Sequence, residues 1–444
     1  MLMDHGFPVS KIHYGVARRV ESRATFTCFR EHGQDFVMQD IIVEKPYEFI
    51  PPTRHTWWST IIRDLNFHGV WLRRNQGVES YEVRDSDRLK KSLAAGHGVL
   101  LTPNHARLGD PLVMGWLARD VRCHVYAMAS WHLFHQSGFM RWAIRKMGAF
   151  SVYREGIDRK AINLAIDSLE SAERPLIIFP EGAVTRTNDR LHAMLDGVAF
   201  IARTAAKRRA RSHPGGKVVT HPVALKYLFQ GDFDQTADPV LTEIERRLSW
   251  RPQRDLPMNR RIAKVGLALL TLKELEYLGV AYTDALEDRL RRLTDRLLCP
   301  LEEEWFGRSK EGHVVPRVKA LRMKIMPDMV NGRIDETERG RRWGQLEDLY
   351  LAQQISCYPP NYLRRMSVDR MLETIERFEE DLTDTVRVHG KLKVVIQVGE
   401  AIEVSPKRDR SAEVDPLMVS IETSLQGMLD QLALESRNYE PQEH

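Results

Sequence analysis

The chain has 444 residues, enough for one large domain or for roughly two or three ordinary ones. Hydrophobic residues make up 43% and charged residues 29% of the chain, and the mean hydropathy is −0.40, which together exclude collagen-like, disordered and polytopic membrane proteins. The 66 Lys and Arg residues exceed the 61 Asp and Glu residues, and the resulting net charge of +5 permits attraction to phosphates or anionic lipid without requiring nucleic acid.

The first 52 residues are predicted to form an N-terminal arm, because Pro51-Pro52 cannot continue a helix or a central strand. Beyond it, Trp57, Trp58, Ile61 and Ile62 recur at helical spacing with arginines around them, which predicts an amphipathic helix. Such a helix could lie in a lipid interface with Trp at headgroup depth, or it could simply cover the core. No apolar stretch approaches the roughly 18 residues that cross a bilayer, so any membrane contact is expected to be peripheral.

Between about residues 96 and 227, short β-prone runs alternate with helical runs, a pattern typical of a mostly parallel sheet. The predicted fold is therefore α/β, with a central sheet flanked by helices, and its core spans residues 53–230. The expected strands of this region are Gly98–Thr102, His124–Met128, Ala149–Tyr153, Leu176–Phe179 and Val218–Lys226. In open sheets of this kind, binding and catalytic sites form at the carboxyl ends of the strands.

After Phe229 the β-prone runs stop for roughly 150 residues, too many for a structureless loop in a compact domain. Leucine stripes at helical spacing predict a large helical insertion over residues 231–388. A strand over Lys393–Val398 and a helix over Met418–Leu434 then return to the core, so residues 389–444 are expected to complete it.

The segment Asn104-His105-Ala106-Arg107-Leu108-Gly109-Asp110 directly follows the strand Gly98–Thr102. Residues five apart on a regular helix point about 140° away from each other, so contact between His105 and Asp110 requires a turn. Gly109 and Pro111 favour such a turn just before a helix. Asp110 could then orient the His105 ring while the other ring nitrogen removes a proton from a hydroxyl. Alternatively, Asp110 caps the helix and His105 is an ordinary loop residue.

Three further candidates lie at the ends of neighbouring strands. Glu181 and Gly182 follow a strand that Pro180 ends, and Arg154 follows the strand that begins at Ala149. A guanidinium suits an anionic headgroup, and Arg186 is a second-rank candidate for the same role. Each of these residues is also common as an exposed turn residue or as half of a surface ion pair.

These blocks resemble those of the glycerolipid acyltransferases, the family that includes the lysophosphatidic acid acyltransferases. The blocks Asn104-His105 to Asp110, Gly148 to Arg154, Phe179-Pro180-Glu181-Gly182 and His221 to Leu225 occur in the family's order. The resemblance covers roughly residues 57–229 and 391–434. It implies an O-acyltransferase that moves a fatty acyl group from acyl-CoA or acyl carrier protein to a glycerol-phosphate or lysophospholipid-like acceptor.

The resemblance also implies the role of each residue. His105 would be the general base, with Asp110 as its partner. Arg154, Glu181, Gly182 and Arg186 would hold the acceptor, while Asn104 and Pro222 would lie on the acyl-donor side. No cofactor, metal or nucleic acid is implied, and the protein is expected in the cytoplasm, peripheral on the anionic inner face of the cell membrane.

One departure from the family pattern concerns the acceptor. Many relatives carry Thr-Arg-Ser directly after Glu-Gly, whereas Ala183-Val184 intervene here before Thr185-Arg186, so a phosphate on the acceptor stays an open question. Two other readings stay open as well. One is a catalytically silent scaffold that binds lipid or acyl carrier, and the other is a hydrolytic metal site made of His105, Asp110 and Glu181.

Overall fold

The computed structural model describes residues 42–440 except 359–361, 363–365 and 410. The described residues all belong to one compact unit. Residues 1–41 of the predicted arm lie outside the described residues. The last part of the arm, Ile42 to Pro52, has no regular secondary structure. Ile50 in this part is buried against Trp131 and Phe134.

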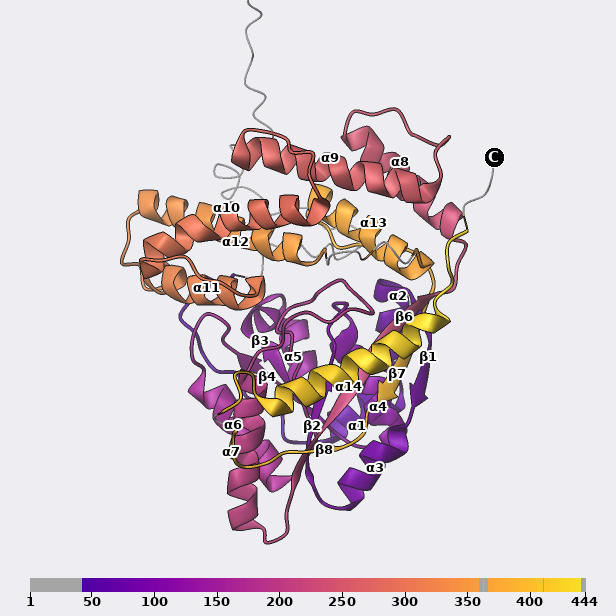
Figure 1. Ribbon diagram of the computed structural model, residues 1–444. Coiled ribbons are helices and arrows are strands. Elements are labelled where there is room, and N and C mark those ends of the chain that lie inside the picture. Colours follow the sequence, from indigo (N-terminus) through magenta and orange to yellow (C-terminus); the bar gives the residue numbers. More distant parts are fainter. Residues whose placement is uncertain (1–41, 359–361, 363–365, 410, 441–444) are drawn as a thin grey trace, which may run out of the picture. The chain divides into compact units, whose positions relative to one another are not determined.

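The centre of the unit is a mixed, mostly parallel sheet in the order β1-β7-β6-β2-β5-β3-β4, with β8 paired to β6 (Figure 1). Strands β6, β2, β5, β3 and β4 are parallel neighbours, whereas β7 runs antiparallel to β6. The strands are β1 Val78–Arg84, β2 Gly98–Pro103, β3 Tyr126–Ser130, β4 Ala149–Val152, β5 Leu176–Ile177, β6 Val218–Phe229, β7 Leu392–Val398 and β8 Ile402–Glu403. The predicted α/β class is confirmed.

Strands β2 and β6 are buried at every position, as expected for parallel strands covered on both faces. The surrounding helices are α1 Trp57–Asp64, α2 Phe67–Gln76, α3 Ser86–Ala94, α4 Asp110–Val121, α5 Gly138–Lys146, α6 Arg159–Ser171, α7 Gly197–Ser212 and α14 Pro416–Leu432. Helix α14 crosses one face of the sheet along β6 (Figure 1).

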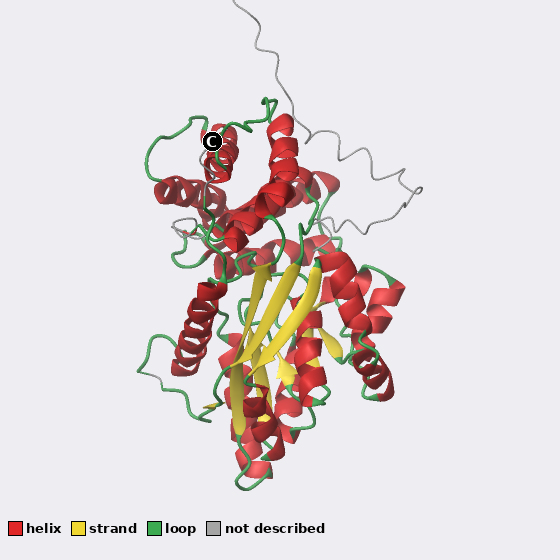
Figure 2. Ribbon diagram, turned by 90° about the vertical axis from the view of Figure 1, so that its right-hand side faces the viewer, coloured by secondary structure: helices red, strands yellow, loops and turns green. Residues whose placement is uncertain are grey.

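Among the described residues, six α-helices separate β6 from β7, where the sequence predicts the helical insertion. They are α8 Phe233–Arg247, α9 Met258–Leu278, α10 Leu286–Phe306, α11 Val314–Val330, α12 Glu336–Ser356 and α13 Val368–Thr383. Figure 2 shows that they gather beyond one end of the strands. Side chains of α8, α9 and α13 join the hydrophobic cluster of the sheet, while α10, α11 and α12 form a second cluster together with Leu270 of α9.

One predicted helical segment differs from the structure. The expected amphipathic helix is broken into α1 and α2 at Asn66, whose φ of 54° is left-handed and cannot continue a helix. Residues Trp131–His135, between β3 and α5, form a 3-10 helix. Among the described residues, no helix combines the length and apolar content that crossing a bilayer requires.

Candidate active site

The turn between β2 and α4 brings His105 and Asp110 together. Nδ1 of His105 lies 3.0 Å from Oδ2 of Asp110, and the N–H of Arg107 donates to the same oxygen at 2.8 Å. The predicted turn is therefore present, although α4 begins at Asp110, one residue before the predicted start at Pro111. Asp110 is fully buried, so it accepts hydrogen bonds inside the protein instead of from water.

The second oxygen of Asp110 has a partner that the sequence did not indicate. The hydroxyl of Tyr227, near the end of β6, donates to Oδ1 of Asp110. Burial and the nearby Asp110 charge raise the pKa of Tyr227 well above its ordinary value, so the phenol stays protonated and donates. Asp110 is thus held by three donors and has little freedom to turn away from His105.

Glu181 lies beside the histidine, as the adjacent positions of β2 and β5 predict. Its Oε1 accepts from the backbone N–H of His105 at 2.8 Å, and its Oε2 accepts from the backbone N–H of His192 at 2.9 Å. Glu181 therefore fixes the loop beneath the imidazole. Burial raises its pKa to about 7 despite these two donors.

The His105 ring has one side free for chemistry. It packs on Phe179 with ring centroids 4.2 Å apart, and its side chain keeps 11% of its surface exposed. When the Nδ1 hydrogen donates to Asp110, the lone pair of Nε2 is available to accept a proton. This arrangement can act as a general base.

Gly182 and Asn104 shape this turn. Gly182 has a φ of +69°, a left-handed conformation that favours glycine at this position. The Asn104 amide donates to the carbonyl of Leu225 at 3.1 Å and accepts from its N–H at 2.7 Å. Asn104 thereby fixes the end of β2 to β6.

Pro222 lies inside the sheet. It pairs with Thr102 of β2, and three residues, or about 10 Å of strand, separate it from Leu225 at the level of Asn104. Pro222 lies at the point where the strand paired with this edge of β6 changes from β8 to β7. Its missing N–H therefore interrupts neither the β6–β8 nor the β6–β7 hydrogen-bond ladder. Pro222 can therefore influence an acyl site only through its neighbours.

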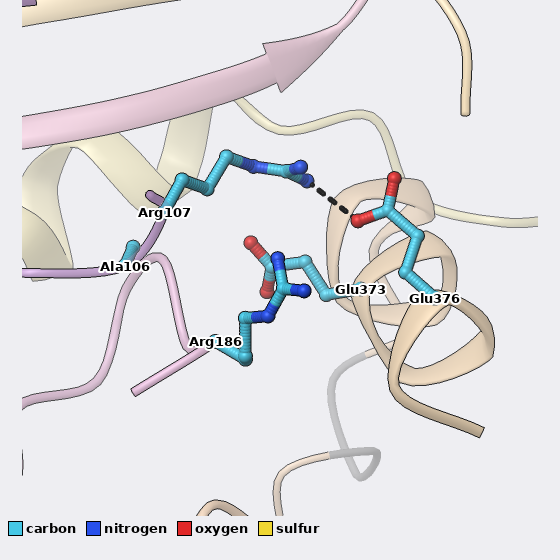
Figure 3. Close-up of a pocket in the computed structure, with 5 residues that line it drawn as sticks. All are labelled: Ala106, Arg107, Arg186, Glu373 and Glu376. Carbon is cyan, nitrogen blue, oxygen red and sulfur yellow. Dashed lines mark ion pairs between the residues drawn. The ribbon is translucent and has the colours of Figure 1, made fainter. Parts of the chain in front are cut away.

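Helix α13 covers this rim of the sheet and pairs with its arginines. Arg107 contacts Glu376 at 3.0 Å, and Arg186 forms an ion pair with Glu380. Figure 3 shows the small cavity between them, lined by Ala106, Arg107, Arg186, Glu373 and Glu376. Because its lining is mostly charged, this cavity suits a polar group better than a fatty tail. Arg186 could bind an acceptor only if its pair with Glu380 opened.

Arg154 lies at the end of β4, beyond β5 and β3 from His105. Burial lowers its pKa, an effect that the charge of Glu155 partly offsets. Of the predicted site residues, the structure brings His105, Asp110, Glu181, Gly182 and Asn104 together. Arg154 lies further along the same rim, Arg186 lies under α13, and Pro222 lies within the sheet.

The metal-site alternative receives no support from the donor arrangement. Both oxygens of Glu181 accept from backbone N–H groups, and Asp110 accepts from three donors. Over the part of the chain that the structure describes, no three His, Cys, Asp or Glu side chains are arranged to hold a metal ion.

Comparison with known proteins agrees with this geometry. A family model described as Acyltransferase matches residues 80–226, from β1 to β6. Residues 80–226 therefore form a domain that matches the Acyltransferase family. The matched segment contains every predicted site residue, whereas the helical insertion lies outside it. The resemblance expected from the sequence is thereby confirmed for this acyltransferase domain.

The 1-acyl-sn-glycerol-3-phosphate acyltransferase of Streptococcus pneumoniae (strain ATCC BAA-255 / R6) is 34% identical over 110 residues. The aligned residues make up 25% of this chain and 38% of that protein, so the chain spans well under half of this relative's length. The likeness concerns the acyltransferase domain alone.

Proposed function

We propose that the protein is an O-acyltransferase that moves a fatty acyl group from an acyl thioester to a hydroxyl of a glycerol-phosphate or lysophospholipid-like acceptor. The observation that carries the proposal is the 3.0 Å contact between His105 Nδ1 and Asp110, inside a domain that matches the acyltransferase family. The acyl donor is acyl-CoA or acyl carrier protein.

In the proposed reaction, Nε2 of His105 accepts the proton of the acceptor hydroxyl while the hydroxyl oxygen attacks the thioester carbonyl carbon. Asp110 stabilises the imidazolium that forms. The tetrahedral intermediate then breaks its carbon–sulfur bond, and the imidazolium returns the proton to the departing thiolate. No covalent enzyme intermediate is needed, and base catalysis of this kind is typically worth about 10² to 10⁴ in rate.

A direct test is the release of free thiol from acyl-CoA in the presence and absence of a lysophospholipid. We expect release that depends on the acceptor and that falls at least about 100-fold in His105→Ala. Lys324→Gln, an exposed substitution on α11, is the matched control with full activity. Unchanged turnover in His105→Ala would reject the imidazole as the base.

A second candidate, a catalytically silent scaffold that binds lipid or acyl carrier, is favoured by the cover that α13 places over Arg107 and Arg186. The two candidates differ in the same assay. A scaffold binds lysolipid or acyl carrier but releases no thiol. His105→Ala then leaves the binding unchanged.

We further propose peripheral contact with an anionic membrane through an aromatic face on α1 and α5. Trp57 and Phe139 are 54% and 75% exposed, and Trp58 and Trp142 connect them through ring contacts of 4.2 to 6.0 Å. Exposed aromatic clusters of this kind are typical of membrane interfaces. The basic residues of α7 and the turn after it are a weaker candidate for this contact. Three of them, Arg203, Arg208 and Lys217, already pair with Asp415, Asp167 and Glu403.

A further inference from the structure

Two arginines on the rim of the sheet begin at the backbone that positions His105. The N–H and the hydroxyl of Thr185 donate to the carbonyl of His105 at 2.8 and 3.2 Å, so Arg186 directly follows a residue that holds the candidate base in place. Arg107 lies two residues after His105, and its N–H donates to Asp110. Whatever binds these two guanidinium groups is therefore linked to the loops around the imidazole.

Carboxylates of α13 occupy both guanidinium groups. Nη2 of Arg107 lies 3.0 Å from Oε2 of Glu376, and Arg186 forms an ion pair with Glu380. All four side chains are buried, so solvent screens these pairs little. Figure 3 shows Arg107 and Arg186 reaching into one small cavity, which has no room for a water molecule. An acceptor phosphate cannot reach either arginine until a pair opens.

Arg186 is held in a strained backbone conformation. Its φ of 57° lies in the left-handed region, which a residue with a Cβ adopts only at a cost. The other left-handed residues with side chains in the described part of the chain adjoin a helix, whereas Arg186 lies within a loop. Strain of this kind persists where the surroundings impose it, and it is concentrated in switches and binding sites. Opening the ion pair with Glu380 removes one restraint that holds Arg186 in this conformation.

A second cation for Glu380 lies on the same helix. Arg377 precedes Glu380 by three residues, a spacing that makes side chains neighbours on a helix surface. Arg377 is 2% exposed, and its Nε and Nη1 have no hydrogen-bond partner within the described residues. Its guanidinium carbon lies 4.2 Å from the centre of the Tyr358 ring, and a carboxylate would add charged hydrogen bonds that the ring cannot supply. Glu380 can therefore leave Arg186 and still have a partner.

We propose that Glu380 makes an autoinhibitory contact: it occupies Arg186 in the resting protein, and the phosphate of the acceptor displaces it toward Arg377. The inference rests on the proposed function and adds regulation by the helical insertion, which lies outside the segment that matches the Acyltransferase family. Each charge has a partner before and after the exchange, so neither state contains a new bare buried charge. A phosphate monoester competes well with a carboxylate, because it carries more negative charge and offers more oxygens to a guanidinium fork.

Calorimetric titration of the full chain with sn-glycerol 3-phosphate tests the exchange. The apparent affinity of a ligand is reduced in proportion to the fraction of protein that is open. We therefore expect Glu380→Gln to bind at least about tenfold more tightly than wild type, and Arg377→Gln to bind about tenfold more weakly. Arg186→Gln/Glu380→Gln should show no gain, because the gain requires Arg186. Coenzyme A carries phosphates as well, so a parallel titration with 3′,5′-ADP, its phosphate-bearing part, separates the two sources.

The matched control is Glu379→Gln, which removes a buried carboxylate of the same helix that pairs with Arg387 and His389 instead of a rim arginine. Its affinity for sn-glycerol 3-phosphate should equal that of wild type. Three results would overturn the inference: no binding of sn-glycerol 3-phosphate to wild type or to any variant, a Glu380→Gln affinity no higher than that of wild type, or a gain confined to 3′,5′-ADP.

Melting temperatures separate the exchange from a pair that only stabilises the fold. Glu380→Gln leaves Arg186 without a carboxylate, so we expect it to melt below wild type without ligand and to gain more from sn-glycerol 3-phosphate. A lower melting temperature without a gain in affinity would contradict the proposal. If this variant does not fold, Glu380→Asp replaces it. The shorter side chain keeps the charge but reaches Arg186 less well, and a smaller gain of the same sign is expected.

Turnover separates this inference from the proposed function. In Glu380→Gln we expect a lower KM for a lysophosphatidate acceptor, with little change in kcat and no change in KM for a neutral monoacylglycerol. A KM for lysophosphatidate that does not respond to Glu380→Gln would reject the autoinhibitory contact and leave the acyltransferase intact. Tighter binding of sn-glycerol 3-phosphate by Glu380→Gln, in a protein without thiol release, would support the contact and reject the acyltransferase.

Discussion

Asp110 is the most constrained side chain of the candidate site, because its three donors come from the turn between β2 and α4 and from β6. His105 and Arg107 are its neighbours in the chain, and their contacts could be predicted from the turn before α4. Tyr227 is 117 residues away and reaches Asp110 only because β6 lies beside β2 in the sheet. No local pattern reports such a contact, since it depends on strand order and register.

Tyr227→Phe tests this contact. The change removes one donor to Asp110 and leaves the ring in place, so we expect a loss of roughly 1 to 3 kcal/mol in the free energy of unfolding. With the imidazole less firmly oriented, kcat should fall about tenfold while KM for the acceptor stays constant. Steady-state kinetics and urea unfolding measure the two effects. A change in KM alone would assign Tyr227 to substrate binding instead.

The pH dependence of stability tests the environment of Glu181. Its folded-state pKa of about 7 lies above the ordinary value of 4.5, so the folded protein holds this proton more tightly than the unfolded chain. The resulting stabilisation is complete below pH 4.5 and is lost as the pH rises through about 7. Glu373, buried on α13, has a pKa of about 7 for the same reason and adds to the effect.

We therefore expect the free energy of unfolding to fall less steeply in Glu181→Gln than in wild type over this pH interval. Urea unfolding at a series of pH values provides the comparison. Glu440→Gln, which changes an exposed carboxylate near the C-terminus, is the control. Identical slopes in Glu181→Gln and wild type would contradict the assigned environment.

At the scale of elements, α13 joins the insertion to the rim of the sheet that carries the candidate site. Its buried face carries Glu373, Glu376 and Glu380, and two of these carboxylates pair with Arg107 and Arg186. The sequence predicts the apolar stripe of this helix but not the acidic one. Carboxylates at helical spacing are usually solvated, and only their arginine partners on the rim explain their burial.

Glu376→Gln tests this contact. Removing one charge of a buried pair leaves Arg107 uncompensated, so we expect a loss of about 3 to 5 kcal/mol in the free energy of unfolding. The double variant Arg107→Met/Glu376→Met removes both charges and should lose much less. Chemical denaturation of both proteins gives the comparison. Equal losses in the two variants would mean that the ion pair itself, and not the orphaned charge, determines stability.

The elements of the central sheet were predictable to different degrees. Strands β2, β4, β6 and β7 are found at the expected places because their apolar runs are long or lie between clear turns. Strand β1 was not predicted, since most of Val78–Arg84 is exposed or half-buried at the edge of the sheet and its sequence is rich in charged residues. Edge strands lack the apolar pattern that identifies buried ones.

At the scale of the whole chain, the α/β class and the order of the blocks were predictable. The alternation of β-prone and helical runs in the sequence determines that a central sheet is layered between helices. The packing of the insertion was not. Helices α8, α9 and α13 share the hydrophobic cluster of the sheet, and this contact depends on tertiary packing that helical periodicity cannot report. The domain boundaries at residues 230 and 388 stay a prediction.

The proposed membrane contact is tested by sedimentation with anionic vesicles. Trp57→Ser/Phe139→Ser removes two exposed aromatic side chains. We expect vesicle affinity to fall at least about tenfold, because burying an apolar side chain in lipid contributes free energy roughly in proportion to its area, over about 1 kcal/mol for each ring. Leu434→Ser is the matched control, since Leu434 is 73% exposed but lies outside α1 and α5. Equal binding by the aromatic variant and wild type would exclude this face as the contact.

The most direct test of the catalytic account is the kcat/KM for acyl transfer in His105→Ala, Asp110→Asn and the double variant. Asp110 is proposed to act only through the imidazole, so the loss in the double variant should equal the loss in His105→Ala alone, about 10² to 10⁴. Losses that multiply, or a His105→Ala protein with wild-type kcat/KM, would contradict the account.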